Sequence, residues 1–242
     1  MTSTLFVADH LLTRPLVQHL RSVSPIDISL SPRFDSTGFA LIEPGHIPDL
    51  PGHTIDSECG LSLRDCGTVQ FLSPIRPDEL DAPTIRLQTE SITTELLARA
   101  TLPSYFGFTG ARWANSDGSG WDALVVDGSA GLAPTESAFC EDVVRAWFVL
   151  TGLPVVTHVL AVPDGFDPAD RDAIVAAIHE CFTASLEEAI IALTTAGAEE
   201  ERVRDLFDNL ATVLGAEERL SVPELFRRAQ LGPRFGPFRW LT

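Results

Sequence analysis

The chain has few basic residues and lacks any long hydrophobic run. It has 17 Lys and Arg against 34 Asp and Glu, which gives a formal charge of −17 over 242 residues. This charge disfavours nucleic acid and anionic membranes as partners, because both are negatively charged. Asp and Arg interrupt every apolar stretch before it reaches the length of a membrane span. The N-terminus has no basic region before its apolar residues, so no secretory signal is predicted and we expect a cytoplasmic protein.

Metal-binding motifs are also missing. The four cysteines form no C-x-x-C pair and have no pair of histidines nearby; they are Cys59, Cys66, Cys140 and Cys181. We interpret them as small buried hydrophobes or unused thiols. His46 and His53 lie in a proline-rich segment that we expect to be a surface loop, because their spacing is not typical of a metal site.

What is present is an ordinary globular composition, with 45% hydrophobic residues, 17 Gly and 17 Pro. The most informative stretch runs from residue 122 to residue 163. It predicts a short strand over Ala123–Val126, a turn at Asp127-Gly128, a helix over Glu141–Leu150 and a buried strand over Val155–Val162. Gly152 and the proline after it are typical of a helix end. Two buried strands joined by a helix indicate a parallel crossover.

This stretch resembles a known family. Asp142-x4-Trp147 followed by TGLPVV (residues 151–156) is similar to the D-L-G-x-x-W-x-x-x-T-G-L-P-F-V segment of chorismate dehydratase, an enzyme of the futalosine route to menaquinone. LVVDGSAGL (residues 124–132) resembles the family's L-I-G-D-x-A-L strand and loop. Near the N-terminus, Thr13, Pro15 and Leu16 match the family's Y-L-N-T-x-P-L.

The resemblance implies an α/β fold like that of a type II periplasmic binding protein, with two lobes and a ligand cleft between them. Lobe one would comprise residues 1–73 and 158–242, and lobe two residues 74–157. The segment from Ser73 to Pro83 has three prolines, and we interpret it as one crossover between the lobes. We expect a monomer or a homodimer.

The strongest chemical signal is the predicted helix start near Ser91. Hydroxyls at Ser91, Thr93 and Thr94 gather where unpaired backbone N–H groups and the helix dipole favour an anion. The family's S-x-T-S motif holds a carboxylate at this place. The alternative is simple capping, with Ser91 as the N-cap residue.

The resemblance implies further site residues. Aligning Val69 with the family places Thr68 at the position of an active-site serine, where its hydroxyl is retained. The alternative is a solvent-facing threonine in a strand. Gly128 and Ser129 are interpreted as presenting backbone N–H groups to the ligand.

Two departures from the family concern the N-terminal motif. Leu12 stands where the family has an asparagine that contacts the substrate, and His10 stands where it has a tyrosine. A leucine side chain forms no hydrogen bond, so His10 or Asp9 would supply the missing polar contact; alternatively, His10 is a turn residue without a role. Glu43, at the end of a predicted strand, either faces the cleft or is a solvated loop charge.

The reaction that the resemblance implies is the loss of water from chorismate to give 3-[(1-carboxyvinyl)oxy]benzoate. It implies no cofactor and no metal, with the substrate's own carboxylate as the base and Thr68 and His10 as catalytic residues. One alternative is a non-catalytic protein of the same fold that binds a small carboxylate, which Leu12 favours. Another is a lyase of the family's other branch, acting on cyclic futalosine, but the S-P-C-P-N-D-like opening of that branch is absent here.

Overall fold

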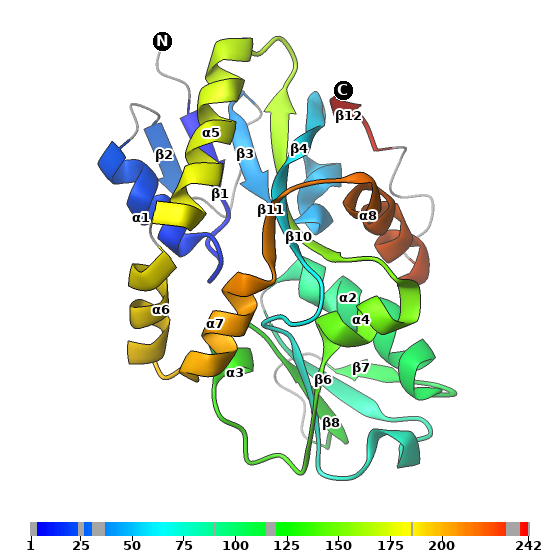
Figure 1. The fold of residues 1–242 in the computed structure, drawn as a ribbon. Helices are drawn as coiled ribbons and strands as arrows, with labels where there is room; N and C mark the ends of the chain where they lie inside the picture. Colours follow the sequence, from blue (N-terminus) through cyan, green and yellow to red (C-terminus); the bar gives the residue numbers. More distant parts are fainter. Residues whose placement is uncertain are drawn as a thin grey trace.

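Two β-sheets with helices around them make up the chain (Figure 1). The structure is a computed structural model, and it describes residues 4–23, 27–30, 37–89, 91–114, 120–184, 186–230 and 238–241. The two sheets lie one above the other in Figure 1, and each belongs to one lobe.

The larger sheet belongs to lobe one and has the strand order β11-β4-β10-β3-β1-β2, with β12 beside β4. Parallel pairing joins β1 to β2 and to β3, whereas β10 runs antiparallel to β3 and β4. The strands are β1 (Thr4–Val7), β2 (Asp27–Leu30), β3 (Phe39–Ile42), β4 (His53–Leu63), β10 (Val155–Pro163), β11 (Leu210–Val213) and β12 (Trp240–Leu241).

The smaller sheet belongs to lobe two and has the order β7-β6-β8-β5-β9. Its central strand β8 is parallel to β6 and antiparallel to β5. The strands are β5 (Gln70–Ser73), β6 (Thr84–Gln88), β7 (Arg112–Ala114), β8 (Ala123–Val126) and β9 (Phe139–Asp142).

Helices cover both sheets. α1 (Arg14–Val23) packs against α5 (Pro168–Ala184) on lobe one, and α2 (Ile92–Phe106) packs against α4 (Val143–Thr151) on lobe two. α8 (Ala216–Arg228) contacts both α2 and β10, so it links the two lobes. The remaining helices are α3 (Ser129–Leu132), α6 (Leu186–Thr195), α7 (Glu200–Asp208) and the 3-10 turns η1 (Pro44–Asp49) and η2 (Pro77–Glu79).

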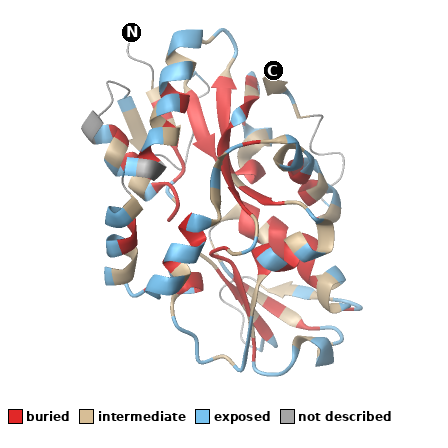
Figure 2. Cartoon of the chain, viewed as in Figure 1, coloured by how far each residue is buried: buried red, intermediate tan, exposed pale blue. Residues whose placement is uncertain are grey.

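Side chains that point alternately to the two faces of the larger sheet form a hydrophobic core on each face. Leu160 and Val162 of β10 join one hydrophobic cluster, whereas Val159 and Ala161 join the other. Side chains two residues apart point to the same face of a strand, so one strand contributes to both clusters. Figure 2 shows the buried residues concentrated in these strands and between the lobes, with exposed residues on the outer faces of the helices.

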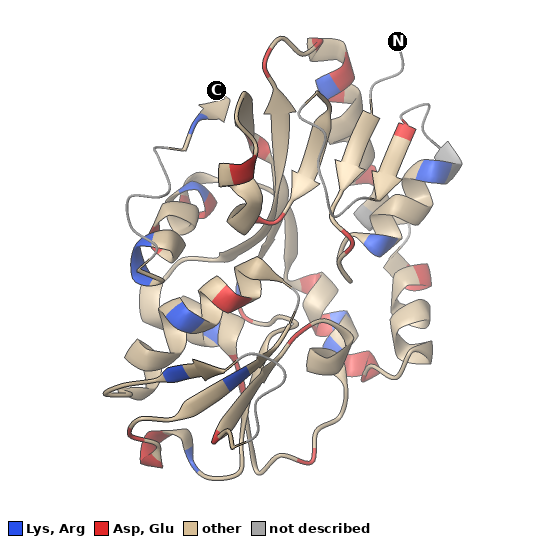
Figure 3. Cartoon of the chain, turned by 180° about the vertical axis from the view of Figure 1, so that it is seen from behind, with Lys and Arg blue, Asp and Glu red and all other residues tan. Residues whose placement is uncertain are grey.

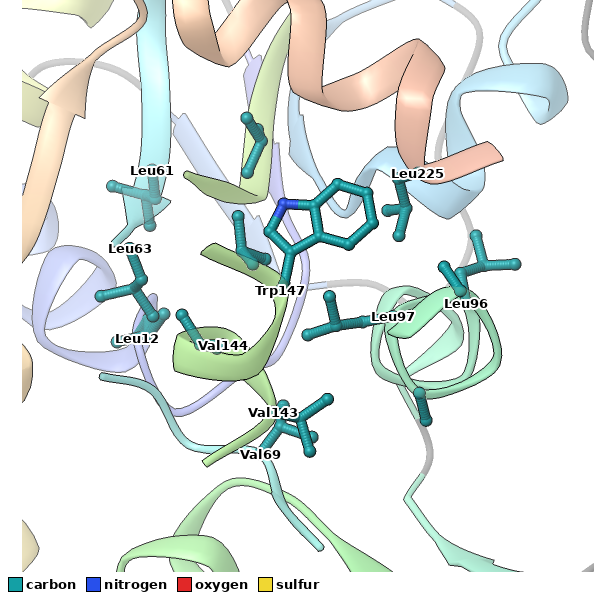
Figure 4. Close-up of a cluster of buried hydrophobic side chains, with 14 of the residues drawn as sticks. Leu12, Leu61, Leu63, Val69, Leu96, Leu97, Val143, Val144, Trp147 and Leu225 are labelled. Atoms are coloured by element: carbon teal, nitrogen blue, oxygen red, sulfur yellow. The ribbon is translucent and has the colours of Figure 1, made fainter. Parts of the chain in front are cut away.

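The hydrophobic cluster that contains Val159 and Ala161 continues from lobe one into lobe two. At its centre lies Trp147 of α4, whose side chain is fully buried. Figure 4 shows Leu97 of α2 and Leu225 of α8 beside the indole ring. The lobes therefore share one apolar core.

The chain passes from one sheet to the other at residues other than those that the sequence predicts. β5 (Gln70–Ser73) already belongs to the sheet of lobe two, so the chain crosses between residues 64 and 69 and not at Ser73 to Pro83. The whole of β10 belongs to lobe one, so the return crossing lies at residues 152–154. The predicted parallel crossover between β8 and β10 is wrong, because these strands lie in different sheets.

One other prediction that concerns this sheet has a clear outcome. His53 is buried in β4, with Nε2 3.0 Å from the carbonyl oxygen of Gly38, so the predicted surface loop is wrong at this residue. At the other end of the chain, Phe238 stacks on Phe226 and Trp240 pairs with β4. No helix within the described residues is long and apolar enough to cross a lipid bilayer.

Candidate functional site

A small pocket lies between the lobes at the carboxyl ends of parallel strands. β1 and β3 lead into His10 and Glu43 in lobe one, and β6 and β8 lead into Ser91 and Asp127 in lobe two. Ligands of open α/β sheets bind at such strand ends. The pocket volume is about 20 Å³, room for one or two water molecules. The lining residues are His10, Glu43, Leu63, Thr68, Val69, Ser91, Thr93, Thr94, Leu97, Asp127, Val144, Val155, Thr157 and His158.

Polar and apolar side chains both line the pocket, and the lining residues that the structure describes include no strong cation. None of the described residues that line it is an arginine or lysine, whereas two are carboxylates. Figure 3 shows Asp and Glu spread over both lobes of this chain, whose net charge is −17. Among the described residues, no group of three or more His, Cys, Asp or Glu side chains is placed to hold a metal ion.

Helix α2 begins at the pocket with Ser91 as its N-cap residue. The Ser91 hydroxyl oxygen accepts a hydrogen bond from the Thr94 N–H at 3.0 Å. The Glu43 carboxylate accepts from the Ser91 hydroxyl at 2.6 Å and from the Thr93 N–H at 3.0 Å, both at Oε2. Thr93 in turn accepts from the backbone N–H of Gly45 at 3.3 Å. A carboxylate from lobe one therefore occupies the helix start in lobe two.

This arrangement corrects the prediction made for Ser91, Thr93 and Thr94. Their hydroxyls and amides do gather at one helix start, and that start does hold a carboxylate. The carboxylate, however, belongs to Glu43 of the same chain, so the donors are not free for a ligand in this conformation. The open alternative for Glu43 is also settled, because its side chain is buried and lines the pocket.

Asp127 is the second buried carboxylate and follows β8. It accepts hydrogen bonds from the Thr68 hydroxyl at 2.5 Å, from the Gly128 N–H at 2.5 Å and from the Thr94 hydroxyl. Burial raises the pKa of Asp127, but the nearby His10 together with these hydroxyl donors outweighs burial and holds the pKa below its usual range. Asp127 is therefore ionised inside the pocket.

His10 faces Asp127 across the gap between the lobes, with Nε2 3.9 Å from Oδ2. The turn that carries it is fixed by Thr13, whose hydroxyl donates to the Ala8 carbonyl at 2.5 Å and accepts from the His10 N–H at 3.1 Å. Burial lowers the pKa of His10, but Asp127 and then Glu43 raise it, and the net change is upward. The structure therefore places His10 in the site.

The other predicted residues have mixed outcomes. Thr68 lines the pocket and binds Asp127, so its solvent-facing alternative is excluded. Gly128 contributes a backbone N–H, but to Asp127. Ser129 is exposed at the start of α3, and Leu12 is fully buried in the core; neither lines the pocket.

The segment that carries the family resemblance has structural roles here. Asp142 caps α4 by accepting from the Val144 N–H at 2.8 Å, and its other oxygen accepts from the Gly67 N–H at 2.9 Å. It thereby fixes the crossing segment that carries Thr68. Thr151 ends the same helix, donating to the Trp147 carbonyl at 2.8 Å and accepting from the Leu153 N–H at 3.1 Å.

Sequence reasoning did not assign Asp127 or His158 to the site. Asp127 is recognisable as a polar residue directly after a buried strand, where parallel strands bring functional groups together. His158 is the one imidazole within the apolar run of β10, and it is fully buried. A buried polar residue in such a run is the signal that could have identified it.

Comparison with protein-family models and with curated proteins gives no match. Solved structures do match over nearly the whole chain. Protein AF1704 from Archaeoglobus fulgidus has a TM-score of 0.65 at 12% identity, covering 94% of this chain and 96% of the other. The aliphatic sulphonate binding protein SsuA from Escherichia coli has a TM-score of 0.61 at 12% identity, covering 96% and 94%.

A third match is the CA3427 gene product of Candida albicans, described as exhibiting the generic periplasmic binding protein fold. Its TM-score is 0.53 at 11% identity, with 98% of this chain and 92% of the other covered. The chain has the periplasmic-binding-protein-like fold. The predicted fold class is thereby confirmed, and identities this low show the fold alone.

Proposed function

We propose that the chain binds a small carboxylate between its lobes and removes water from it, with chorismate as the substrate. The observation that carries the proposal is the helix start of α2, which already holds a carboxylate through the Ser91 hydroxyl and the Thr93 N–H. Backbone donors at a helix start bind anions without a basic side chain. A pocket with no arginine among its described lining residues, in a chain of charge −17, can use this means of binding.

In this proposal the substrate replaces Glu43. One carboxylate leaves the donors as another arrives, so the negative charge at the helix start does not increase. His10 can donate a hydrogen bond to further negative charge, because its Nδ1 accepts from the Leu12 N–H and its Nε2 faces the gap between the lobes. The pocket volume of about 20 Å³ is far too small for chorismate. Binding therefore also requires the lobes to separate, as lobes or loops that close around ligands do.

Chorismate is chosen because of the sequence resemblance given above. Its conversion to 3-[(1-carboxyvinyl)oxy]benzoate needs a held substrate, removal of one proton and departure of hydroxide. Hydroxyls, two imidazoles and two buried carboxylates line the pocket, which is sufficient for positioning and proton transfer.

The test is incubation of the purified chain with chorismate, with the product followed by ultraviolet absorbance. We expect turnover by the wild-type protein. Absence of both binding and turnover in the wild-type protein contradicts the proposal.

A second function is favoured by one residue. The side chain of Leu12 is fully buried and apolar, so it offers no polar contact where the family has asparagine. A non-catalytic protein that binds a small carboxylate fits this departure. Thermal stabilisation of the chain by chorismate without formation of product would select this function over the dehydratase.

A further inference from the structure

His158 has an unusual environment within the pocket. It lies on β10, its side chain has no exposed surface, and its Nε2 atom has no hydrogen-bond partner among the described residues. Buried polar atoms are nearly always paired, so an unpaired one in a pocket points to a group that meets a ligand.

A β-bulge aims His158 at the pocket. Adjacent residues of a regular strand point to opposite faces, yet Thr157 and His158 both line the pocket. The pairing of β10 with β4 shifts register between Val156 and His158, which explains how two neighbours share one face. Bulges of this kind redirect side chains beside active sites.

The hydrogen bonds of Thr157 fix the position of the proton on the ring. The Thr157 hydroxyl donates its only hydrogen to the Leu61 carbonyl at 3.2 Å. Its oxygen lies 3.2 Å from Nδ1 of His158, so in this contact the ring nitrogen is the donor. A neutral imidazole with its hydrogen on Nδ1 has a free lone pair on Nε2.

The second imidazole of the pocket lies beside the first, with ring centroids of His10 and His158 5.1 Å apart. Their environments differ. Burial, and then the charge of His10, hold the pKa of His158 well below its usual range, whereas Asp127 and Glu43 raise that of His10. The Leu12 N–H donates to Nδ1 of His10 at 3.3 Å, so the ring hydrogen of His10 stands on Nε2, the atom that faces Asp127.

We propose that Nε2 of His158, in place of the substrate's own carboxylate, is the proton acceptor of the pocket and that the Nε2–H of His10 is the hydrogen-bond donor to the departing hydroxide. The assignment rests on the proposed function. The lone pair of His158 takes the proton from carbon, and the C–H electron pair becomes the new C=C bond. The C–O bond breaks with its electrons going to oxygen, and the hydroxide leaves while it accepts a hydrogen bond from His10. His158 ends protonated and His10 unchanged.

His158→Asn tests the assignment. An asparagine amide can still donate to Thr157 in place of Nδ1, but it has nothing at the position of Nε2. We expect the turnover number for chorismate to fall by about 10² to 10⁴-fold, the usual contribution of general acid–base catalysis. The dissociation constant of the product should change by less than about threefold, because binding uses other groups. His179→Asn is the control, since His179 lies on α5 and does not line the pocket.

The ring proton is tested without substrate, by nitrogen NMR of the protein labelled in histidine. We expect a protonated Nδ1 and an unprotonated Nε2 for His158 at neutral pH. A protonated Nε2, or wild-type turnover by His158→Asn, overturns the assignment and leaves the proposed function intact. A wild-type protein that neither binds nor converts chorismate overturns the proposed function instead.

Discussion

Replacing Glu43 by glutamine should make the pocket bind carboxylates more tightly. In the structure, Oε2 of Glu43 accepts from the Ser91 hydroxyl at 2.6 Å and from the Thr93 N–H at 3.0 Å. A bond to a charged acceptor is worth about 1 kcal/mol more than a bond to a neutral one, so glutamine competes for the two donors less well by about 2 kcal/mol. That difference corresponds to binding tighter by about 30-fold.

The assay is calorimetric titration with 3-[(1-carboxyvinyl)oxy]benzoate, the expected product, which is not consumed. Glu136→Gln is the matched control, because it removes the same charge from an exposed residue. The melting temperature should fall by at most about 4–8 °C, since about 2 kcal/mol of contact between the lobes is lost. Equal affinity of the Glu43→Gln variant and the wild type, with both folded, would refute the exchange of one carboxylate for another.

Three further predictions concern stability. Trp147→Ala should lower the free energy of unfolding in urea by about 3–5 kcal/mol, because it leaves a cavity in the core that both lobes share; a loss below about 1 kcal/mol would contradict that packing. Arg171→Met should cost about 3–5 kcal/mol in the same assay, because it leaves the fully buried Asp56, 2.7 Å from the guanidinium, without its cation. His158 stays neutral in the folded state, so its contribution is fully present above the unfolded pKa of about 6.5 and falls as pH decreases below that value. Wild-type stability should therefore decrease more than that of His158→Asn between pH 7.5 and pH 5.5, about 1 kcal/mol per pH unit at most; parallel curves would argue against a buried neutral imidazole.

Local patterns predicted much of the fold. The apolar runs over Ala123–Val126 and Val155–Val162 are strands β8 and β10, and the spacing around Trp147 marks helix α4. Gly152 has φ of 71° at the end of that helix, as expected of a glycine that terminates it. These features depend on residues close in sequence.

Sheet membership could not be predicted in the same way. β5 (Gln70–Ser73) and β10 (Val155–Pro163) lie in different sheets, and nothing in their local sequence states which sheet each strand joins. The prolines after Ser73 predict a crossing because prolines mark turns, but this segment connects two strands within lobe two.

In the candidate site, too, the features set by neighbouring residues were predictable and those set by distant residues were not. The hydroxyls near Ser91 were recognisable because a helix start needs caps and attracts anions. The carboxylate that meets them comes from Glu43, 48 residues away, and depends on how the lobes close. The bulge that turns His158 toward the pocket depends on the pairing with β4.

The most direct measurement is a crystal structure of the chain with 3-[(1-carboxyvinyl)oxy]benzoate bound. We expect a ligand carboxylate within hydrogen-bond distance of the Thr93 N–H and the Ser91 hydroxyl, with Glu43 withdrawn from both. A ligand bound elsewhere while Glu43 keeps its two hydrogen bonds would show that no exchange of carboxylates takes place at this helix start.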